Sequence, residues 1–159
     1  MRDILLSARS AAAELRQLFD PTPLQRNDHL SKRHDADIWL KREDLTPVRS
    51  YKIRGAFNAM RRVLADRPEQ QIFVCASAGN HAQGVAFACR HFGRKGVIFM
   101  PVTTPRQKID KTRTFGGDAV EIRLVGDYFD QSLAAAQTFC AQVGGCFLSP
   151  FDDDDVIEG

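Results

Sequence analysis

The hydrophobic residues of the chain follow two periods that alternate from about residue 50 onward. Apolar residues spaced three or four positions apart predict amphipathic helices over four segments, 51–65, 80–92, 104–116 and 127–143. Continuous apolar runs predict buried strands at 72–76 and 97–100, and a last short strand is predicted at 146–148. The strict alternation of apolar and charged residues at 119–125 predicts instead a half-exposed strand at the edge of a sheet.

This order of elements is typical of repeated strand–helix–strand units. Successive strands begin about 25 residues apart with one helix between each pair, as in parallel strands joined by crossover helices. The expected fold class is therefore α/β, with a parallel sheet in a three-layer α/β/α arrangement. Ser50 is the expected N-cap of the helix over 51–65, and Gly93 is expected to end the helix over 80–92.

The two ends of the chain have different patterns. An amphipathic helix is predicted over 3–19, and two prolines soon after it stop it. The polar segment 24–35 could form a short helix, and the apolar run at 38–40 suits a strand. Acidic residues at 152–155 favour the start of a helix, because carboxylates suit a helix N-terminus. Since a helix of one turn is an unusual domain ending, we expect the chain to be a fragment.

Composition and charge exclude several classes of function. The 159 residues carry 22 basic and 20 acidic side chains, a net charge of +2, and the two signs are interspersed. This balance gives no electrostatic basis for binding nucleic acid or an anionic membrane. The longest apolar runs are far too short to span a bilayer, and an acidic residue at position 3 argues against a signal peptide. We therefore expect a cytoplasmic, globular protein.

The cysteines indicate no metal centre. Cys75, Cys89, Cys140 and Cys146 lie in apolar segments, and no two of them form a C-x-x-C pair. This placement favours buried, reduced thiols over a zinc site or a disulfide framework. No metal site is predicted.

The loop between the strand at 72–76 and the helix at 80–92 is a candidate anion site. It reads Ser-Ala-Gly-Asn-His from residue 77 and passes from strand to helix through small residues. The unpaired N–H groups and partial positive charge of a helix N-terminus could hold a carboxylate there. The plainer alternative is a strand-to-helix turn capped by Ser77 or Asn80. The loop matches neither a dinucleotide fingerprint nor a Walker loop.

Lys52 is the candidate nucleophile. It begins the predicted helix over 51–65, where the helix dipole disfavours a cation, and Arg49 and Arg54 would act in the same direction. These surroundings favour the neutral amine that imine chemistry requires. A solvated surface lysine is the alternative interpretation of Lys52 taken alone.

The loop and the lysine together resemble one group of enzymes. The chain is similar to the pyridoxal-phosphate enzymes of the tryptophan-synthase-β fold group (fold type II), and within it to threonine dehydratases, also called threonine ammonia-lyases. The similarity extends over nearly the whole chain from about residue 20. The segments that carry it are Thr22-Pro23-Leu24, Leu40-Lys41-Arg42-Glu43-Asp44, Ser50-Tyr51-Lys52-Ile53-Arg54-Gly55-Ala56, Ser77-Ala78-Gly79-Asn80-His81-Ala82-Gln83-Gly84 and Thr104-Pro105-Arg106-Gln107-Lys108.

The resemblance implies roles for individual residues. Lys52 would carry pyridoxal 5'-phosphate as an imine and, once freed by the substrate, act as base on its Cα proton. Asn80 would hydrogen-bond the pyridoxal ring hydroxyl. The substrate carboxylate would be held by the loop matching Ser77, Ala78, Gly79, Asn80 and His81. The implied reaction converts L-threonine into 2-oxobutanoate and ammonia, a step towards isoleucine, and would convert serine into pyruvate.

Ala78 narrows the choice of reaction. Related serine racemases usually carry a serine there as an acid/base, and alanine cannot deliver a proton, so dehydration is favoured over racemisation. The cysteine-synthase branch usually has Thr-Ser-Gly-Asn-Thr in this loop and is a weaker match. The resemblance further implies a small amino-acid substrate and a homo-oligomeric full-length form.

The resemblance also divides the chain. Residues 1–50 would begin the large pyridoxal-phosphate domain, 51–150 would form the small parallel α/β domain, and 151–159 would return to the large domain. Neither Gly116-Gly117 nor Gly144-Gly145 resembles the glycine-rich loop that holds the cofactor phosphate in the family. The alternatives are therefore a catalytically incompetent truncated α/β module, or another fold type II enzyme such as a serine dehydratase or racemase.

Overall fold

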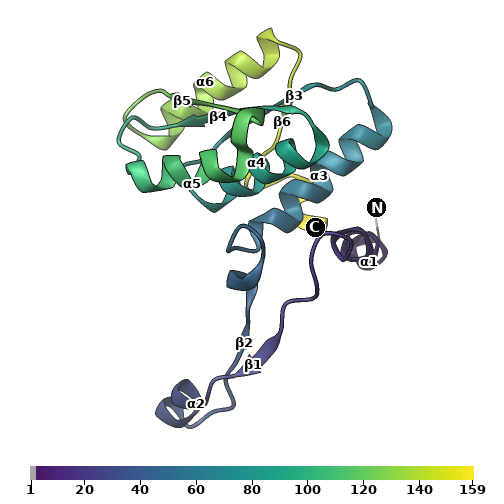
Figure 1. The fold of residues 1–159 in the computed structure, drawn as a ribbon, viewed down its shortest axis with the longest axis vertical. Coiled ribbons are helices and arrows are strands. Elements are labelled where there is room, and N and C mark those ends of the chain that lie inside the picture. Colours follow the sequence, from purple (N-terminus) through teal and green to yellow (C-terminus); the bar gives the residue numbers. More distant parts are fainter. Residues whose placement is uncertain (1–2) are drawn as a thin grey trace.

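The computed structural model describes residues 3–159 and consists of an α/β body from which an N-terminal arm projects (Figure 1). The helices are α1 (Ile4–Leu15), α2 (Asp28–His34), α3 (Lys52–Asp66), α4 (Asn80–Phe92), α5 (Arg106–Gly116), α6 (Phe129–Gln142) and α7 (Asp154–Glu158). The strands are β1 (Leu24–Arg26), β2 (Trp39–Lys41), β3 (Ile72–Ala76), β4 (Lys95–Met100), β5 (Val120–Leu124) and β6 (Cys146–Phe147). Two 3-10 turns complete the order, η1 (Glu43–Leu45) and η2 (Gly117–Ala119).

The body is built on a four-stranded parallel sheet with the order β5-β4-β3-β6. The chain passes outward from β3 through β4 to β5, then crosses back to place β6 beside β3. The strand order therefore reverses between β3 and β6. In open parallel sheets this reversal leaves a crevice outside the carboxyl ends of the two strands, where ligands bind.

Helices cover both faces of the sheet, which confirms the three-layer α/β/α prediction (Figure 1). Phe73 and Cys75 of β3 point into the larger core with residues of α3, α4 and α5. Val74 and Ala76 point to the opposite face and pack against α6. Burial on both faces explains why β3 and residues 97–100 of β4 are continuously apolar. The edge strand β5 is only half-buried, as its alternating sequence predicts.

The N-terminal arm is an antiparallel pair, β1 with β2, that carries α2 away from the body (Figure 1). The segment expected to be one short helix is thus a three-residue strand followed by α2. The cause is local: Asn27 adopts an extended conformation and accepts a hydrogen bond from the N–H of Leu30, which starts the helix only at Asp28.

Some predicted helix ends are confirmed, but the helix expected over 3–19 ends already at Leu15, and the predicted cap of α3 is wrong. Gly93 ends α4 in the left-handed conformation, at φ 61°, and Asp153 caps α7. Ser50, however, does not cap α3: Tyr51 occupies the N-cap position and no side chain bonds the helix start. The Ser50 N–H is instead turned towards Thr46, whose hydroxyl oxygen it reaches at 3.0 Å.

The last helix, α7, packs on α3 near its beginning. A methyl group on Gly55 would lie 2.4 Å from the carbonyl oxygen of Val156, so only glycine allows this approach. Asn58 further donates a hydrogen bond of 2.7 Å to the carbonyl of Asp155.

The division of the chain into two domains, with boundaries near residues 50 and 150, stays a prediction. Within residues 3–159, no helix has the length and apolar character needed to cross a membrane.

Candidate active site

Two loops leave the sheet side by side at its strand-order reversal. Because β3 and β6 are adjacent and parallel, their carboxyl ends meet at one edge. The loop 77–79 follows β3 there, and the segment 148–150 follows β6. A hydrogen bond of 2.8 Å from the Leu148 N–H to the Val74 carbonyl extends the pairing beyond β6. These two segments and the start of α3 form the candidate site.

Lys52 is the first residue of α3 and is half-buried. Its Nζ donates a hydrogen bond of 3.0 Å to the carbonyl oxygen of Pro150, in the segment that follows β6. The amine thereby lies on the wall of a cavity of about 240 Å³. The other lining residues are Tyr51, Arg54, Gly55, Pro150, Phe151, Val156, Ile157 and Gly159. Lys52 is therefore half-buried on a cavity wall, and it is not the solvated surface lysine of the alternative interpretation.

The helix that follows the candidate anion loop packs directly on Lys52. A methyl group on Gly84 of α4 would lie 2.8 Å from the Lys52 carbonyl oxygen, closer than a side-chain carbon can approach. Glycine at 84 therefore lets α4 sit against the backbone of Lys52. The contact packs α4 against the first residue of α3, and Asn80 begins α4 four residues before Gly84.

The loop before α4 leaves the helix start open. The N–H of Gly79 donates to the Ser77 hydroxyl at 3.2 Å, but no side chain caps the helix itself. The predicted cap by Ser77 or Asn80 is therefore wrong, because Ser77 bonds a residue that precedes the helix. Space is open around Gly79, and the Asn80 side chain is exposed. The first N–H groups of α4 are available to an anion.

His81 is turned into the protein and is only 3% exposed. Its Nε2 lies 3.1 Å from the Leu148 carbonyl oxygen, and within residues 3–159 its Nδ1 has no hydrogen-bond partner. Burial lowers the pKa of His81 to about 4, the charge of Lys52 acts in the same direction, and the Leu148 hydrogen bond opposes both. Neutral His81 thus donates from Nε2 to the Leu148 carbonyl, and its ring is buried there.

Of the two arginines expected to disfavour a cation at Lys52, Arg54 has its charge compensated in the structure. Arg54 is paired with Glu43, whose carboxylate lies 2.7 Å from the Arg54 Nε. The positive charge of Arg54 is therefore compensated and does not act alone on Lys52. Arg49 is exposed and has φ 62°, an uncommon conformation for a side-chain-bearing residue.

The thiols take no part in the site. All four cysteines are free, and Cys146 is the only one that is not buried. Burial raises the pKa of Cys89 to about 12 and also raises that of Cys75, so neither supplies a thiolate nucleophile near neutral pH. Across residues 3–159, no cluster of three or more histidine, cysteine or acidic residues is arranged to hold a metal ion.

A parallel sheet with an amine and an open helix start at its strand-order reversal defines the class of α/β protein with a candidate site for a small anionic molecule. Residues 15–159 match the family described as "Pyridoxal-phosphate dependent enzyme". The chain belongs to this family, and its fold is the fold type II expected from the sequence.

Threonine dehydratases are among its relatives. The chain is 52% identical to "L-threonine dehydratase biosynthetic IlvA" of Bacillus subtilis (strain 168) over 138 residues, 87% of this chain and 32% of the relative. It is 48% identical over 145 residues to the protein of the same name from Lactococcus lactis, covering 91% of this chain and 35% of the relative. The chain thus spans about a third of the length of the curated relatives it matches.

Solved structures agree with this relationship. The processed form of threonine deaminase isoform 2 from Solanum lycopersicum superposes with a TM-score of 0.86 at 36% identity, over 99% of this chain and 42% of that one. A second threonine deaminase, from T.th., superposes with a TM-score of 0.84 at 30% identity, over 98% of this chain and 47% of that one.

The residues present fit one end of pyridoxal phosphate. The Lys52 amine on a cavity wall suits an aldehyde, and the open space around Gly79 leaves the neighbouring amide Asn80 accessible. The glycine pairs at 116–117 and 144–145 precede β5 and β6, so they lie at the amino edge of the parallel sheet, opposite Lys52. Neither glycine pair is therefore placed to hold the phosphate of a cofactor that is bound through Lys52.

The sequence missed the contribution of the segment after β6. The carbonyl oxygens of Leu148 and Pro150 accept hydrogen bonds from the His81 Nε2 and from the Lys52 Nζ, respectively. Backbone carbonyls leave no mark in residue identity. The one available signal was position, since 148–150 directly follows a predicted strand of the same sheet.

Proposed function

We propose that Lys52 is the residue through which this protein holds pyridoxal phosphate, in an enzyme that converts L-threonine into 2-oxobutanoate and ammonia. The observation that carries the proposal is the Lys52 amine, held 3.0 Å from the Pro150 carbonyl on the wall of a cavity at the strand-order reversal. The relatives named as threonine dehydratases, 52% and 48% identical, support the choice of reaction.

The cofactor would be held by Lys52 at its aldehyde and by Asn80 at its ring hydroxyl. When bound, pyridoxal phosphate supplies an electron sink that makes loss of the substrate Cα proton feasible. Lys52 would take that proton at Nζ once the substrate amine has replaced it. The Pro150 carbonyl would orient Nζ, because it accepts a hydrogen bond from the charged or the neutral amine.

The substrate carboxylate would lie at the start of α4. The loop of Ser77, Ala78, Gly79, Asn80 and His81 offers backbone N–H groups there, and the helix dipole favours a negative charge. Ala78 carries no group that exchanges a proton, which supports loss of the β-hydroxyl over racemisation. The net reaction balances: threonine loses its hydroxyl and its Cα proton as water, and hydrolysis returns one water and releases ammonia.

The proposal also covers the assembly of the protein, its substrate class and its location in the cell. We infer a homo-oligomeric full-length protein that acts on a small amino acid in the cytoplasm. The names of the relatives, which are threonine dehydratases, support the small amino-acid substrate.

Covalent trapping tests the role of Lys52. The chain is mixed with pyridoxal phosphate, the imine absorbance is followed, and borohydride reduction followed by peptide mass spectrometry locates the modified lysine. We expect modification at Lys52 and its loss in Lys52→Ala. Lys111→Ala is the matched control, because Lys111 is exposed on α5, which does not line the cavity.

The trapping experiment has clear contrary outcomes. Modification spread evenly over the surface lysines, or an imine signal that survives Lys52→Ala, would rule out Lys52 as the cofactor lysine. The reaction itself is tested by measuring 2-oxo acid released from L-threonine and from L-serine by the full-length protein. A product that is racemised amino acid and not 2-oxo acid would contradict the proposed dehydration.

A further inference from the structure

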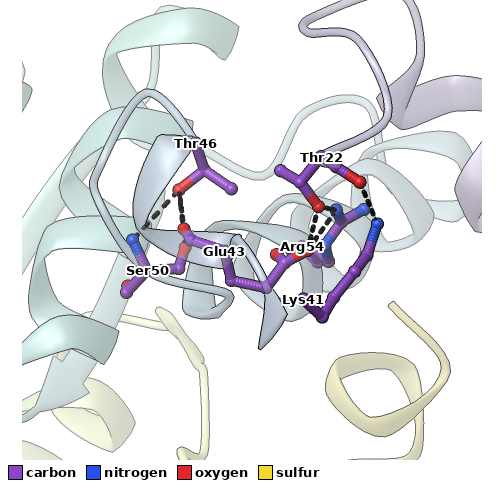
Figure 2. A network of polar contacts seen from close by, with 6 residues as sticks. All are labelled: Thr22, Lys41, Glu43, Thr46, Ser50 and Arg54. Carbon is purple, nitrogen blue, oxygen red and sulfur yellow. Dashed lines mark hydrogen bonds and ion pairs between the residues drawn. The ribbon is translucent and has the colours of Figure 1, made fainter. Parts of the chain in front are cut away.

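A polar network joins the end of the arm to the first turn of α3 (Figure 2). At its centre is the carboxylate of Glu43, which accepts hydrogen bonds from Arg54 Nε at 2.7 Å and Arg54 Nη2 at 2.8 Å. The hydroxyl of Thr22 also donates to Glu43, and the Lys41 ammonium donates to the Thr22 carbonyl. The network therefore ties the segments at 22 and 41–43 to a residue only two positions after Lys52.

A second contact closes the loop between Glu43 and Lys52 (Figure 2). The hydroxyl of Thr46 lies 2.9 Å from the Ser50 carbonyl and 3.0 Å from the Glu43 carbonyl, and it accepts the Ser50 N–H at 3.0 Å. Thr46 is 2% exposed and Ser50 is 6% exposed. Buried hydrogen bonds of this kind hold the backbone that leads into α3 in one conformation.

The charges of the network suit the start of a helix. Arg54 lies in the first turn of α3, where the helix dipole disfavours a cation. The Glu43 carboxylate compensates this cation and adds a negative charge beside the helix start. The Arg54 hydrogen bond lowers the pKa of Glu43, and the Thr22 hydroxyl acts in the same direction, so Glu43 is ionised at neutral pH.

We propose that Glu43 is a positioning residue: by holding Arg54 and Thr22 it sets the first turn of α3, and thereby the direction of the Lys52 amine. The proposal rests on the role proposed for Lys52. Glu43 acts through Arg54 and the backbone. We expect the effect to be local, because Ile53, Phe57 and Met60 anchor α3 in the core at 5% exposure or less.

Two measurements on the same variants distinguish a positioning role of Glu43 from a purely structural one. Glu43→Gln keeps the shape of the side chain but removes the charge that compensates Arg54. Glu121→Gln is the matched control, since Glu121 also lies 2.7 Å from an arginine Nε, that of Arg123, on the edge strand β5. The first measurement is residue-resolved amide exchange, and the second is the share of pyridoxal-phosphate trapping that falls on Lys52.

For exchange, the reporters are the N–H groups of Ser50 and Arg54, which bond to Thr46 and to the Tyr51 carbonyl. In Glu43→Gln we expect their exchange to quicken by roughly ten- to a hundredfold, while amides in the middle of α4 and α6 stay within about twofold. Glu121→Gln leaves the reporters unchanged. In Glu43→Gln with Arg54→Gln, the exchange falls back towards the original rate, because the uncompensated cation is gone.

For trapping, we expect Glu43→Gln to lower the yield at Lys52 relative to that at exposed Lys111, and the double variant to recover part of it. An equal rise in exchange over all elements, or no change at Ser50 and Arg54, would overturn the positioning role. So would an unchanged share of trapping at Lys52. If the unsubstituted chain is not trapped at Lys52, the proposed function fails, and the exchange rates still decide whether Glu43 holds the helix start.

Discussion

Gly84 of α4 faces the carbonyl oxygen of Lys52 so closely that a methyl group at position 84 would lie 2.8 Å from it. We expect Gly84→Ala to destabilise the protein by about 1–3 kcal/mol, because the neighbour is backbone and cannot turn aside. Urea unfolding followed by circular dichroism measures this change. The same substitution should also lower the trapping of pyridoxal phosphate at Lys52, because α3 must move.

Gly79→Ala is the matched comparison for Gly84→Ala. Nothing lies within 4 Å of the position a methyl group would take at 79, and φ there, −145°, is outside the left-handed region that favours glycine. We expect the free energy of unfolding to change by less than about 0.5 kcal/mol. Equal losses of unfolding free energy in Gly79→Ala and Gly84→Ala would show that the close approach to Lys52 is not the reason why position 84 requires glycine.

Arg49→Gly should stabilise the protein. Arg49 adopts φ 62°, in the left-handed region that costs a residue with a side chain about 1 kcal/mol and glycine almost nothing. The side chain is exposed, so little packing is lost. Thermal unfolding should show a higher midpoint by a few degrees. Asp35→Gly, at φ 48° after α2, is the second test of the same reasoning, and a lower midpoint in both variants would contradict it.

Loss of the hydroxyl group should affect stability much less at Ser50 than at Thr46. Within residues 3–159 the Ser50 hydroxyl has no hydrogen-bond partner, so Ser50→Ala should change the free energy of unfolding by less than about 0.5 kcal/mol. The Thr46 hydroxyl makes three contacts with the loop, and Thr46→Val should cost about 1–3 kcal/mol. A loss near 1 kcal/mol in Ser50→Ala would restore the helix-cap interpretation.

His81 should make stability depend on pH in mildly acidic solution. Its pKa is about 4 in the folded protein, lowered chiefly by burial, against an ordinary value near 6.5. The unfolded chain therefore binds this proton first as the pH falls. The stabilisation is fully present above about pH 6.5 and is lost progressively towards pH 4, by about 2 kcal/mol between pH 7 and pH 5.

Urea unfolding at pH 7 and pH 5 tests the His81 prediction with two variants. His81→Gln keeps a donor that can reach the Leu148 carbonyl and removes the titrating ring, so the difference between the two pH values should shrink. His29→Gln is the control, since His29 is exposed on α2 and should leave the difference unchanged. If His81→Gln loses as much stability as the original chain, another group is responsible for the dependence.

Several features of the fold followed from the sequence because they depend on local patterns. A few neighbouring residues were enough to predict three of these features. They are the continuous apolar run of β3, the alternating residues of β5, and Gly93 at the end of α4. Lys52 at a helix start followed in the same way. Ser50 did not, because a serine before a helix either caps it or turns away, and its contact with Thr46 decides which.

The sequence alone determined the order and type of the elements after residue 50, and it placed Lys52 and the Ser77–His81 loop at helix starts, because periodicity and helix dipoles act over short range. The tertiary structure decided which groups meet. Pro150 receives the Lys52 amine across 98 positions of sequence, Glu43 compensates Arg54, and His81 is buried against Leu148. Such contacts arise from the return of β6 beside β3 and from the packing of α4 on α3, and no local pattern encodes either.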